Sequence, residues 1–367
     1  MIGMNFTRPR KLIEEKISRR VRERDRMAVD GVIGQYQEAV RGWNAFRVLT
    51  KLFLQYFDFK PPPKETLDRV FPVKSIDWEK IQHPPKGRIQ ITWLGHSGLL
   101  VQMDDQCILT DPVFSDRCSP FQWIGPKRYR PPPCTLEELC NNIPSASGMT
   151  VLVSHNHYDH LDYNSVHWLL SDSNRRRNDI QFVVPLGLQE WFLAQNFPHK
   201  PAIFELDWHE HMQTSHGSTV TALPMRHWSN RTGDRDATLW CGYSILGPQQ
   251  QTFLFPGDTA WFDDLEGLGE TYGPWDLAAL PIGAYAPREF MQSNHVNVPE
   301  AIRMKDVLRA KSAVPIHWGT FPLTIEPVME PRDRLVELMS KRDDSKQFAP
   351  WRIGETLDFP CLRTADQ

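Results

Sequence analysis

The chain has 367 residues, which is enough for one large domain or two smaller ones. Hydrophobic residues make up 40% and charged residues 24%, and these ordinary values exclude a wholly disordered protein. The net charge of −3 argues against a nucleic-acid partner. The sequence has no apolar run long enough to span a bilayer, no signal-peptide core and no C-x-x-C pair among its six cysteines, so we expect a soluble, intracellular protein with reduced thiols.

The first part of the chain carries few chemical motifs. Residues 1–30 hold nine basic and five acidic residues, which is typical of a solvated, partly helical arm; attraction to anionic lipid is the alternative. Apolar residues at helical spacing predict a helix over residues 31–57, which either packs on the main domain or faces a membrane or the substrate. The prolines at positions 61–63 end that helix, and we expect a loop from there to Gly87.

The pattern changes at Arg88, where short strands separated by turns begin. We expect residues 1–87 to form an N-terminal extension that faces a membrane or a dimer partner, and residues 88–367 to form the main domain. Strands are predicted at residues 89–93, 99–103, 107–110, 151–153, 181–184, 219–223, 239–246, 252–255, 277–282 and 313–316. Helices are predicted at residues 162–170, 187–194, 298–309 and 332–341, with Asp162 and Asn297 as N-caps. This order is typical of an α/β protein with two layered sheets and helices outside.

The most informative motif is His155-Asn156-His157-Tyr158-Asp159-His160, which follows an apolar strand. Neutral imidazoles and carboxylates are the ligands that a divalent metal needs. A single loop rarely directs four ligands at one ion. The alternate positions 155 and 157 can face one metal while Asp159 and His160 face another, so the motif indicates two metals.

Three more candidate ligands follow predicted strands. His227 comes after residues 219–223, Asp258 after residues 252–255, and His317 directly after residues 313–316. Rigid elements hold metal ligands best, which favours these positions. Taken singly, each has a plainer explanation, because a lone histidine after a strand is commonly structural and an aspartate after glycine is commonly a turn residue.

In their order along the chain, these seven residues resemble the ligand set of the metallo-β-lactamase fold, and the resemblance runs from about Arg88 to about Phe359. Flanking stretches narrow it to the N-acyl-phosphatidylethanolamine-hydrolysing phospholipase D family. They are Thr92-Trp93-Leu94-Gly95-His96-Ser97, Leu109-Thr110-Asp111-Pro112, Gly125-Pro126-Lys127-Arg128, Pro281-Ile282-Gly283-Ala284-Tyr285 and Ile316-His317-Trp318-Gly319-Thr320-Phe321.

The resemblance implies an αββα sandwich, with two mixed sheets packed face to face and helices outside. It also implies two Zn²⁺ ions per chain. His155, His157 and His227 would bind one ion, and Asp159, His160 and His317 the other, with Asp258 bridging them. The implied assembly is a homodimer with a lipid channel. Because the implied substrate is a membrane phospholipid, we expect a peripheral protein on the cytosolic face of intracellular membranes.

The reaction that the resemblance implies is hydrolysis of N-acyl-phosphatidylethanolamine to N-acylethanolamine and phosphatidate. A hydroxide shared by the two zinc ions would attack phosphorus, because bound metal lowers the pKa of water. Asp159 and His295 are the predicted catalytic residues, and His295 serves either as the general acid or as a hydrogen-bond donor to phosphate. The alternative is that His295 only packs beside the following helix. His96 is a lesser candidate, either for a supporting hydrogen bond or as a structural turn residue.

Aromatic and cationic residues near the motif are candidates for lipid and phosphate contacts. The predicted substrate-binding residues are Gln122, Trp123, Lys127, Arg128, Tyr158 and Arg231. The alternative is that the loop before residue 133 is simply pinned to the surface by its aromatic side chains. Residues 46–57 and 187–192 are candidate membrane-facing or dimer-forming elements.

Other functions share such a metal site. A lactonase or a cyclic phosphodiesterase would have the same ligands, and a nuclease of this fold is disfavoured because an acidic main domain repels a polyanion. A non-catalytic, zinc-stabilised lipid-binding module is the alternative of another class. The presence of every ligand position argues against it.

Overall fold

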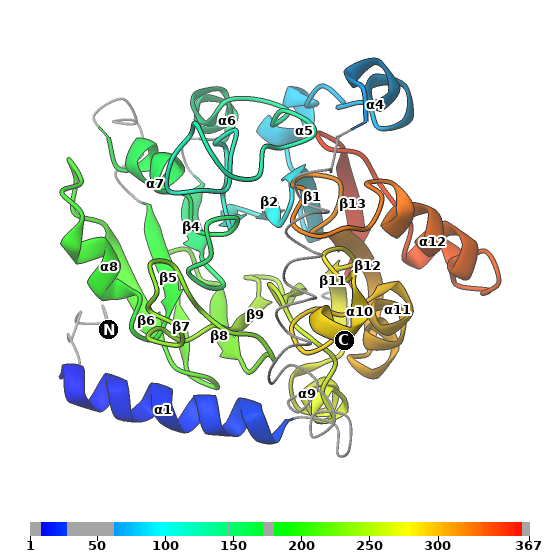
Figure 1. The fold of residues 1–367 in the computed structure, drawn as a ribbon. Coiled ribbons are helices and arrows are strands. Elements are labelled where there is room, and N and C mark those ends of the chain that lie inside the picture. Colours follow the sequence, from blue (N-terminus) through cyan, green and yellow to red (C-terminus); the bar gives the residue numbers. More distant parts are fainter. Residues whose placement is uncertain (1–8, 28–61, 145–146, 172–179, 362–367) are drawn as a thin grey trace.

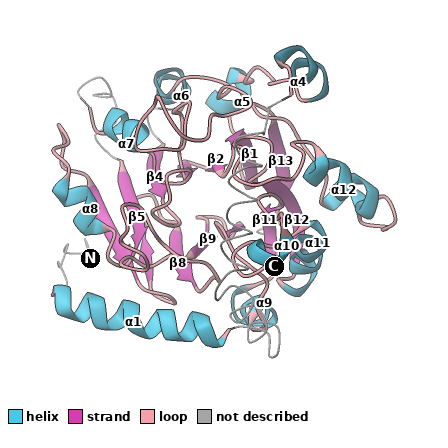
Figure 2. Ribbon diagram, viewed as in Figure 1, coloured by secondary structure: helices cyan, strands magenta, loops and turns pink. Residues whose placement is uncertain are grey.

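The computed structural model describes residues 9–27, 62–144, 147–171 and 180–361, whose strands form two mixed sheets (Figures 1 and 2). The seven-stranded sheet has the order β13-β1-β2-β3-β4-β5-β6, and the six-stranded sheet has the order β12-β11-β10-β9-β8-β7. The strands of the first sheet are β1 (Arg88–Gly95), β2 (Gly98–Met103), β3 (Gln106–Thr110), β4 (Gly148–Leu152), β5 (Gln181–Pro185), β6 (Ala202–Leu206) and β13 (Thr356–Pro360). Those of the second are β7 (His211–Gln213), β8 (Thr219–Leu223), β9 (Gly242–Leu246), β10 (Thr252–Phe255), β11 (Trp275–Pro281) and β12 (Ala310–Ile316).

Each sheet has an antiparallel and a parallel part. Strands β3 to β6 run parallel in the first sheet, as do β10, β11 and β12 in the second. Parallel neighbours end at the same edge of a sheet, and ligands of open α/β sheets gather at the carboxyl ends of such strands. The residues that follow β3 and β4 therefore lie at one edge, and so do those that follow β10 and β12.

The two sheets pack face to face around a shared apolar core. Ile91 and Trp93 of β1 belong to the same buried cluster as Tyr243 of β9, Phe253 of β10 and Leu277 of β11. Each fully buried side chain of this size contributes about 1.5–3 kcal/mol from the removal of apolar surface from water. The shared core fixes the two sheets relative to each other, and with them the loops at their common edge.

Helices cover the outer faces of both sheets, so the predicted αββα sandwich is confirmed. On the first sheet a second apolar cluster joins β3, β4 and β5 to the helices outside, and on the second sheet α11 packs against β11 and β12. The helices are α1 (Arg10–Arg26), α4 (Lys64–Val70), α5 (Trp78–Gln82), α6 (Leu136–Asn142), α7 (Tyr163–Leu169), α8 (Gln189–Ala194), α9 (Leu265–Tyr272), α10 (Arg288–Met291), α11 (Val298–Val307) and α12 (Glu330–Met339), with a 3₁₀ turn at Ser345–Gln347.

Two predictions about local structure are wrong. The expected loop before Gly87 contains α4 and α5, which are short helices held by burial of Leu67 and Ile81. Tertiary packing stabilises helices too short to form alone, and the apolar pattern over so few residues does not reveal them. Asp162 stands at the start of α7 but does not cap it, because its carboxylate accepts hydrogen bonds from Ser115 and Ser165 instead.

The described part of the N-terminal segment, residues 9–27, is helical as predicted, but it packs on the domain instead of extending into solvent. Helix α1 lies against the domain in Figure 1, and its Ile17 is buried. The predicted helix over residues 31–57 lies outside the described residues, and the division of the chain at residue 87 stays a prediction. Within the described ranges, none of the helices combines the length and the apolar character needed to cross a bilayer.

Candidate metal centre

All seven predicted ligands lie at the ends of strands along the edge that the two sheets share. The loop after β4 carries the first four, and the other three follow β8, β10 and β12. Every one is buried except His157, which is half-buried. The seven are His155, His157, Asp159, His160, His227, Asp258 and His317.

Three imidazoles form the first group. The ligand nitrogens of His155, His157 and His227 lie within 4.8 Å of one another. His155 Nε2 is 2.8 Å from His157 Nδ1, and His227 Nε2 is 3.4 Å from the same atom. Three ring nitrogens that converge in this way can bind one metal ion and form one face of its coordination sphere.

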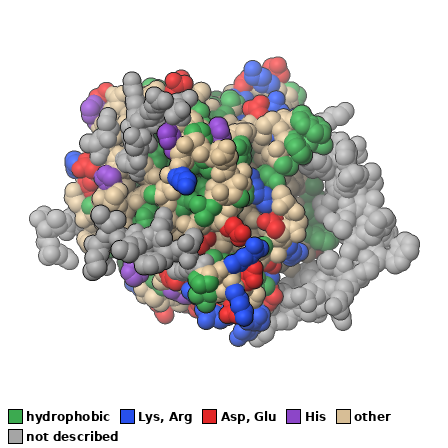
Figure 3. All heavy atoms as spheres, turned by 90° about the vertical axis from the view of Figure 1, so that its left-hand side faces the viewer, with side chains coloured by type: hydrophobic (Ala, Val, Ile, Leu, Met, Phe, Trp, Pro, Cys, Tyr) green, Lys and Arg blue, Asp and Glu red, His purple; other side chains and the backbone are tan. Residues whose placement is uncertain are grey.

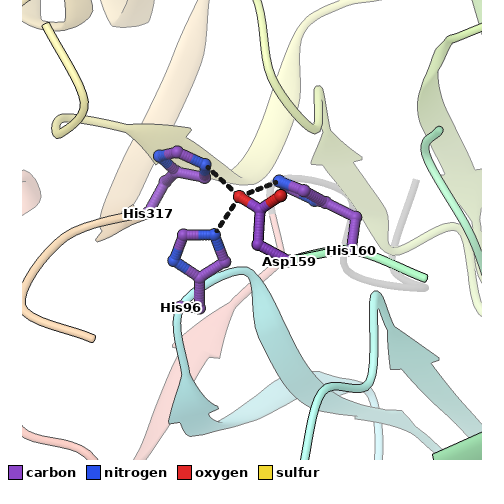
Figure 4. Close-up of side chains that lie close together, drawn as sticks. All are labelled: His96, Asp159, His160 and His317. Atoms are coloured by element: carbon purple, nitrogen blue, oxygen red, sulfur yellow. Dashed lines mark hydrogen bonds and ion pairs between the residues drawn. The ribbon is translucent and has the colours of Figure 1, made fainter. Parts of the chain in front are cut away.

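The second group surrounds the carboxylate of Asp159 (Figure 4). The Oδ2 atom of Asp159 is 3.4 Å from His160 Nε2 and 3.5 Å from His317 Nε2. The same oxygen accepts a hydrogen bond of 2.9 Å from His96 Nε2. The four residues of this group come from three separate parts of the chain, because His96 lies in the β1–β2 turn and His317 directly after β12.

Asp258 faces both groups. Its Oδ2 atom is 3.0 Å from His317 Nε2 and 3.2 Å from His160 Nε2. It is also 3.9 Å from His155 Nε2 and 3.8 Å from His227 Nε2. One carboxylate oxygen is thus shared between two clusters of imidazoles, which is the arrangement expected of a bridging ligand.

The protonation of these groups fits a bound cation. Burial holds the pKa of His155 well below its ordinary value and lowers that of His157 to about 4, so both are neutral, as metal ligands must be. Burial also disfavours charge on His160 and His317, but nearby carboxylates outweigh it and raise the pKa of His317 to about 9. Without a metal, protons must supply the positive charge that Asp159 and Asp258 attract.

Several buried polar atoms of the cluster have no hydrogen-bond partner. Asp258 Oδ1 is one of them, and His160 Nε2 and His317 Nε2 make no well-aligned hydrogen bond although Asp258 Oδ2 lies 3.2 and 3.0 Å from them. Leaving such atoms unpaired costs about 1–3 kcal/mol each. Coordination of a metal would satisfy them, so the donor set fits a divalent ion that accepts both nitrogen and oxygen ligands.

Two ligands are oriented by hydrogen bonds behind their rings. His160 Nδ1 donates to Asp111 Oδ2 over 2.6 Å, and the carboxylate of Asp111 is fixed by the backbone N–H and hydroxyl of Ser154. His227 Nδ1 donates to the carbonyl oxygen of Asn294 over 3.0 Å. Such bonds leave the opposite ring nitrogen free for a metal and raise its basicity.

The role of Asp111 was not predicted, although the sequence carries a signal for it. Asp111 directly follows β3, just as Asp258 and His317 follow strands. The sequence alone does not single it out, because nothing in the sequence shows that β3 and β4 are parallel neighbours. That pairing brings Asp111 beside His160.

The two additional histidines also lie at the centre. His295 Nδ1 has no hydrogen-bond partner and is 3.9 Å from Asp258 Oδ2, and its ring is 5.2 Å from those of His227 and His317. The ring of His96 lies beside that of His317, tilted by 41° with 4.1 Å between the ring centroids. The structure thus places both predicted candidates against the ligands.

The predicted substrate contacts divide into two sets. Trp123 is 76% exposed and stacks on Phe121, whereas Arg128 is buried and donates to the carbonyls of Val113 and Ser115. Arg128 therefore pins its loop. The others have these neighbours: Lys127 pairs with Asp116, Gln122 bonds the backbone of Arg117, and Arg231 lies over the rings of Tyr158 and Trp191.

Comparison with known proteins agrees with this architecture. Residues 106–318 match the model of the β-lactamase superfamily domain. The chain is 38% identical over 341 residues to N-acyl-phosphatidylethanolamine-hydrolyzing phospholipase D 1 of Caenorhabditis elegans, covering 89% of this chain and 92% of the relative. The chain belongs to the N-acyl-phosphatidylethanolamine-hydrolysing phospholipase D family.

Two proteins with lower sequence identity to this chain are also similar to it. The mitochondrial N-acyl-phosphatidylethanolamine-hydrolyzing phospholipase D of Saccharomyces cerevisiae is 32% identical over 277 residues, which cover 73% of this chain and 55% of the yeast protein. A solved metallo hydrolase of Ignicoccus hospitalis, Igni18, has the same fold, with a TM-score of 0.54 at 21% identity, over 74% of this chain and 98% of its own. The protein is therefore a metal-dependent hydrolase of the metallo-β-lactamase fold.

Proposed function

We propose that the protein hydrolyses N-acyl-phosphatidylethanolamine to N-acylethanolamine and phosphatidate. The observation that carries this proposal is the convergence of four buried imidazoles, those of His155, His160, His227 and His317, on one carboxylate oxygen of Asp258. The substrate class comes from the similarity to the worm enzyme, which extends over 89% of this chain.

The metal we propose is zinc, with two ions per chain. His155, His157 and His227 would hold one ion, and Asp159, His160 and His317 the other, while Asp258 contributes to both. The donor set of imidazoles and carboxylates is the one that zinc prefers, and it leaves room at each ion for a non-protein ligand.

The chemistry divides between the metals and the chain. When bound, the zinc ions supply Lewis acidity and a hydroxide nucleophile at neutral pH. The bond that breaks joins phosphorus to the oxygen of the N-acylethanolamine, and the bond that forms joins phosphorus to the oxygen of water. The departing oxygen needs a proton, and the phosphorus side keeps the water oxygen as phosphatidate.

His295 is the residue we assign to the departing group. Its Nδ1 atom is buried, has no hydrogen-bond partner and lies on the side of Asp258. A ring so placed can donate a proton to the leaving oxygen or a hydrogen bond to phosphate. Both interactions stabilise the transition state more than the bound substrate and so lower the barrier. Asp159 acts with it by holding a metal ligand position and accepting the hydrogen bond of His96.

The exposed loop at residues 121–124 is the element we propose for lipid contact. Phe121, Trp123 and Ile124 are all more than half exposed, and two of them stack on each other. Aromatic residues of this kind favour the interface of a bilayer. The protein would thus bind peripherally to the cytosolic face of a membrane, and we propose that it acts as a homodimer.

The lipid contact can be tested by Trp123→Ser. Loss of one interfacial aromatic should weaken binding to phosphatidylcholine vesicles about tenfold in a sedimentation assay, because its apolar surface no longer leaves water. Val336→Ser, which removes another exposed apolar residue from α12, is the matched control and should bind as the wild type does. Equal binding by all three proteins would contradict the assignment of the loop.

The activity itself is tested with three substrates, each with and without a chelator. We expect mass spectrometry to show N-acylethanolamine release from N-acyl-phosphatidylethanolamine, and its loss with chelator. A generic phosphodiester or a lactone cleaved in its place would indicate another hydrolase of this fold. No turnover of any substrate by zinc-loaded protein would favour a non-catalytic lipid-binding module.

A further inference from the structure

Helix α1 packs on the domain through a close apolar contact. Its Ile17 is 4% exposed and packs against Gly187, where a Cβ atom would lie only 2.9 Å from Ile17 Cδ1. Gly187 also has a φ of +89°, so both the close approach of Ile17 and the backbone conformation favour glycine at this position. The helix therefore has one defined position, and it runs beneath the strands in Figure 1.

On the face of α1 that meets the domain, the charged side chains of Lys16, Arg20 and Arg24 pair with carboxylates of the domain. Arg20 Nε donates to Asp207 Oδ1 over 2.9 Å, and Lys16 Nζ lies 3.3 Å from the other oxygen of Asp207, whose side chain is only 2% exposed. In Figure 3, basic and acidic side chains gather side by side at the lower edge, the level at which Figure 1 shows α1.

Arg24, in the last turn of α1, reaches the loop that follows the candidate ligand His227. Its Nη1 atom is 3.0 Å from both carboxylate oxygens of Asp236, and its guanidinium lies over the ring of Trp240. The same Nη1 atom is 3.5 Å from the carbonyl oxygen of His227 itself. The Arg24 side chain is 15% exposed, so water screens this pair only partly.

Asp236 closes that loop at its base. The backbone N–H of Asp236 donates to the carbonyl oxygen of Ser229 over 2.8 Å, and the backbone N–H of Ser229 points back to Asp236 Oδ1 over 3.4 Å. Residues 229–236 thus form a closed loop whose base is held by the carboxylate that Arg24 binds. We call these residues the clasp loop.

The tip of the clasp loop hydrogen-bonds to the loop after β4 that contains residues 155–160, which we call the metal motif. Arg231 Nη1 donates to the carbonyl oxygens of Asn156 and Leu161, over 3.1 Å and 2.8 Å. The backbone N–H of Asn230 donates to the side-chain oxygen of Asn156 over 2.8 Å. These bonds fix the loop that carries four candidate ligands at points on either side of His157 and Asp159.

We infer that α1 is a positioning element of the metal centre and that Arg24 is its positioning residue. The contacts run from Arg24 to Asp236, through the clasp loop to Arg231, and from there to the metal motif. Because Arg24 also contacts the backbone of His227, it supports ligands from both sheets. This inference rests on the proposed function only in requiring that the site holds a metal.

The experiment measures metal release from the zinc-loaded full chain with a chromogenic chelator, beside the thermal midpoint of each variant. Arg24→Gln and Asp236→Asn should each release zinc about tenfold faster than the wild type, the size of effect typical of residues that support metal ligands. The double variant should release it no faster than the faster single variant. Arg24→Lys, which keeps the charge, should recover part of the loss.

Two matched controls separate positioning from general stability. Arg19→Gln removes an exposed arginine of α1 that pairs with Glu23 of the same helix, and Arg342→Gln removes a comparable arginine pair with Asp306 and Asp344. Both should release zinc at the wild-type rate. The inference would be overturned if Arg24→Gln released zinc at the wild-type rate, or if the effects of Arg24→Gln and Asp236→Asn on the release rate were additive. It would also be overturned if Arg342→Gln, at an equal fall in thermal midpoint, released zinc as fast as Arg24→Gln.

The readout does not depend on the substrate. If N-acyl-phosphatidylethanolamine is not cleaved but the variants differ as expected, the proposed function fails and the inference stands. If the wild-type chain binds no metal, both fail. Should Arg24→Gln not fold, Arg24→Lys and Asp236→Asn still decide the outcome, since wild-type release by both would contradict the role of the helix.

Discussion

The two sheets supply the metal centre in different ways. The first sheet provides His155, His157, Asp159 and His160 from a single loop after β4, together with the supporting carboxylate of Asp111. The second sheet provides its three ligands singly, from the ends of β8, β10 and β12. The first half of the site is thus a local motif, whereas the second half exists only after the sheet has formed.

This difference makes Asp258 the critical link. Its Oδ2 atom lies within 4 Å of ligands from both sheets, including His160 and His317. If the local motif were sufficient for metal binding, loss of a ligand from the second sheet would be tolerated. The geometry predicts instead that both halves are needed.

The largest effect should come from Asp258→Asn. An amide cannot replace a buried anionic ligand shared by two imidazole groups, so we expect loss of bound metal and a fall in turnover of about 10³-fold or more. Elemental analysis and the product assay on one preparation measure both. Asp263→Asn, at an exposed position nearby in the sequence, is the control. Full metal content with retained activity would disprove the bridging assignment.

His295→Ala should have the next largest effect. Turnover should fall about 10²–10⁴-fold, the range of a general acid, while metal content stays at the wild-type level. The result separates ligand from catalyst within the second half of the site. Loss of metal would make His295 a ligand beside His227 and Asp258, which the geometry also permits. The control is His83→Ala, which removes an exposed histidine. If His295→Ala were as active as this control, His295 would have no catalytic role.

Asp111→Asn tests the support of the first half. The amide cannot accept from His160 Nδ1 and from both donors of Ser154 as the carboxylate does. We expect metal affinity to fall about 10–100-fold. A competitive chelator titration measures this, with Asp105→Asn at an exposed position as the control. An unchanged affinity would show that the local motif needs no support from β3.

Local features of the site could be predicted from the sequence because they depend on neighbouring residues. The ligand-rich loop and the ligands at strand ends are visible as apolar runs followed by His or Asp. The predicted N-cap Asn297 of α11 is confirmed, and the structure adds Glu300 as its partner in a capping box. A capping box of Thr135 and Glu138 also begins α6, a helix that was not predicted.

Features that depend on distant residues could not be predicted. The pairing of Arg24 with Asp236 spans 212 positions, and a basic sequence alone is typical of a solvated arm. The phosphate contact of Arg128 stays a prediction, but the hydrogen bonds that it donates to the carbonyl oxygens of Val113 and Ser115 are likewise not evident from the sequence. In both cases the fold supplied a partner that the sequence does not identify.

The reaction that we propose requires water to attack phosphorus in N-acyl-phosphatidylethanolamine at this metal centre. Hydrolysis by the zinc-loaded protein in H₂¹⁸O, followed by mass spectrometry of both products, tests it most directly. We predict one ¹⁸O atom in phosphatidate and none in N-acylethanolamine. Label in the N-acylethanolamine, or no release of it by protein with a full metal content, would contradict the account.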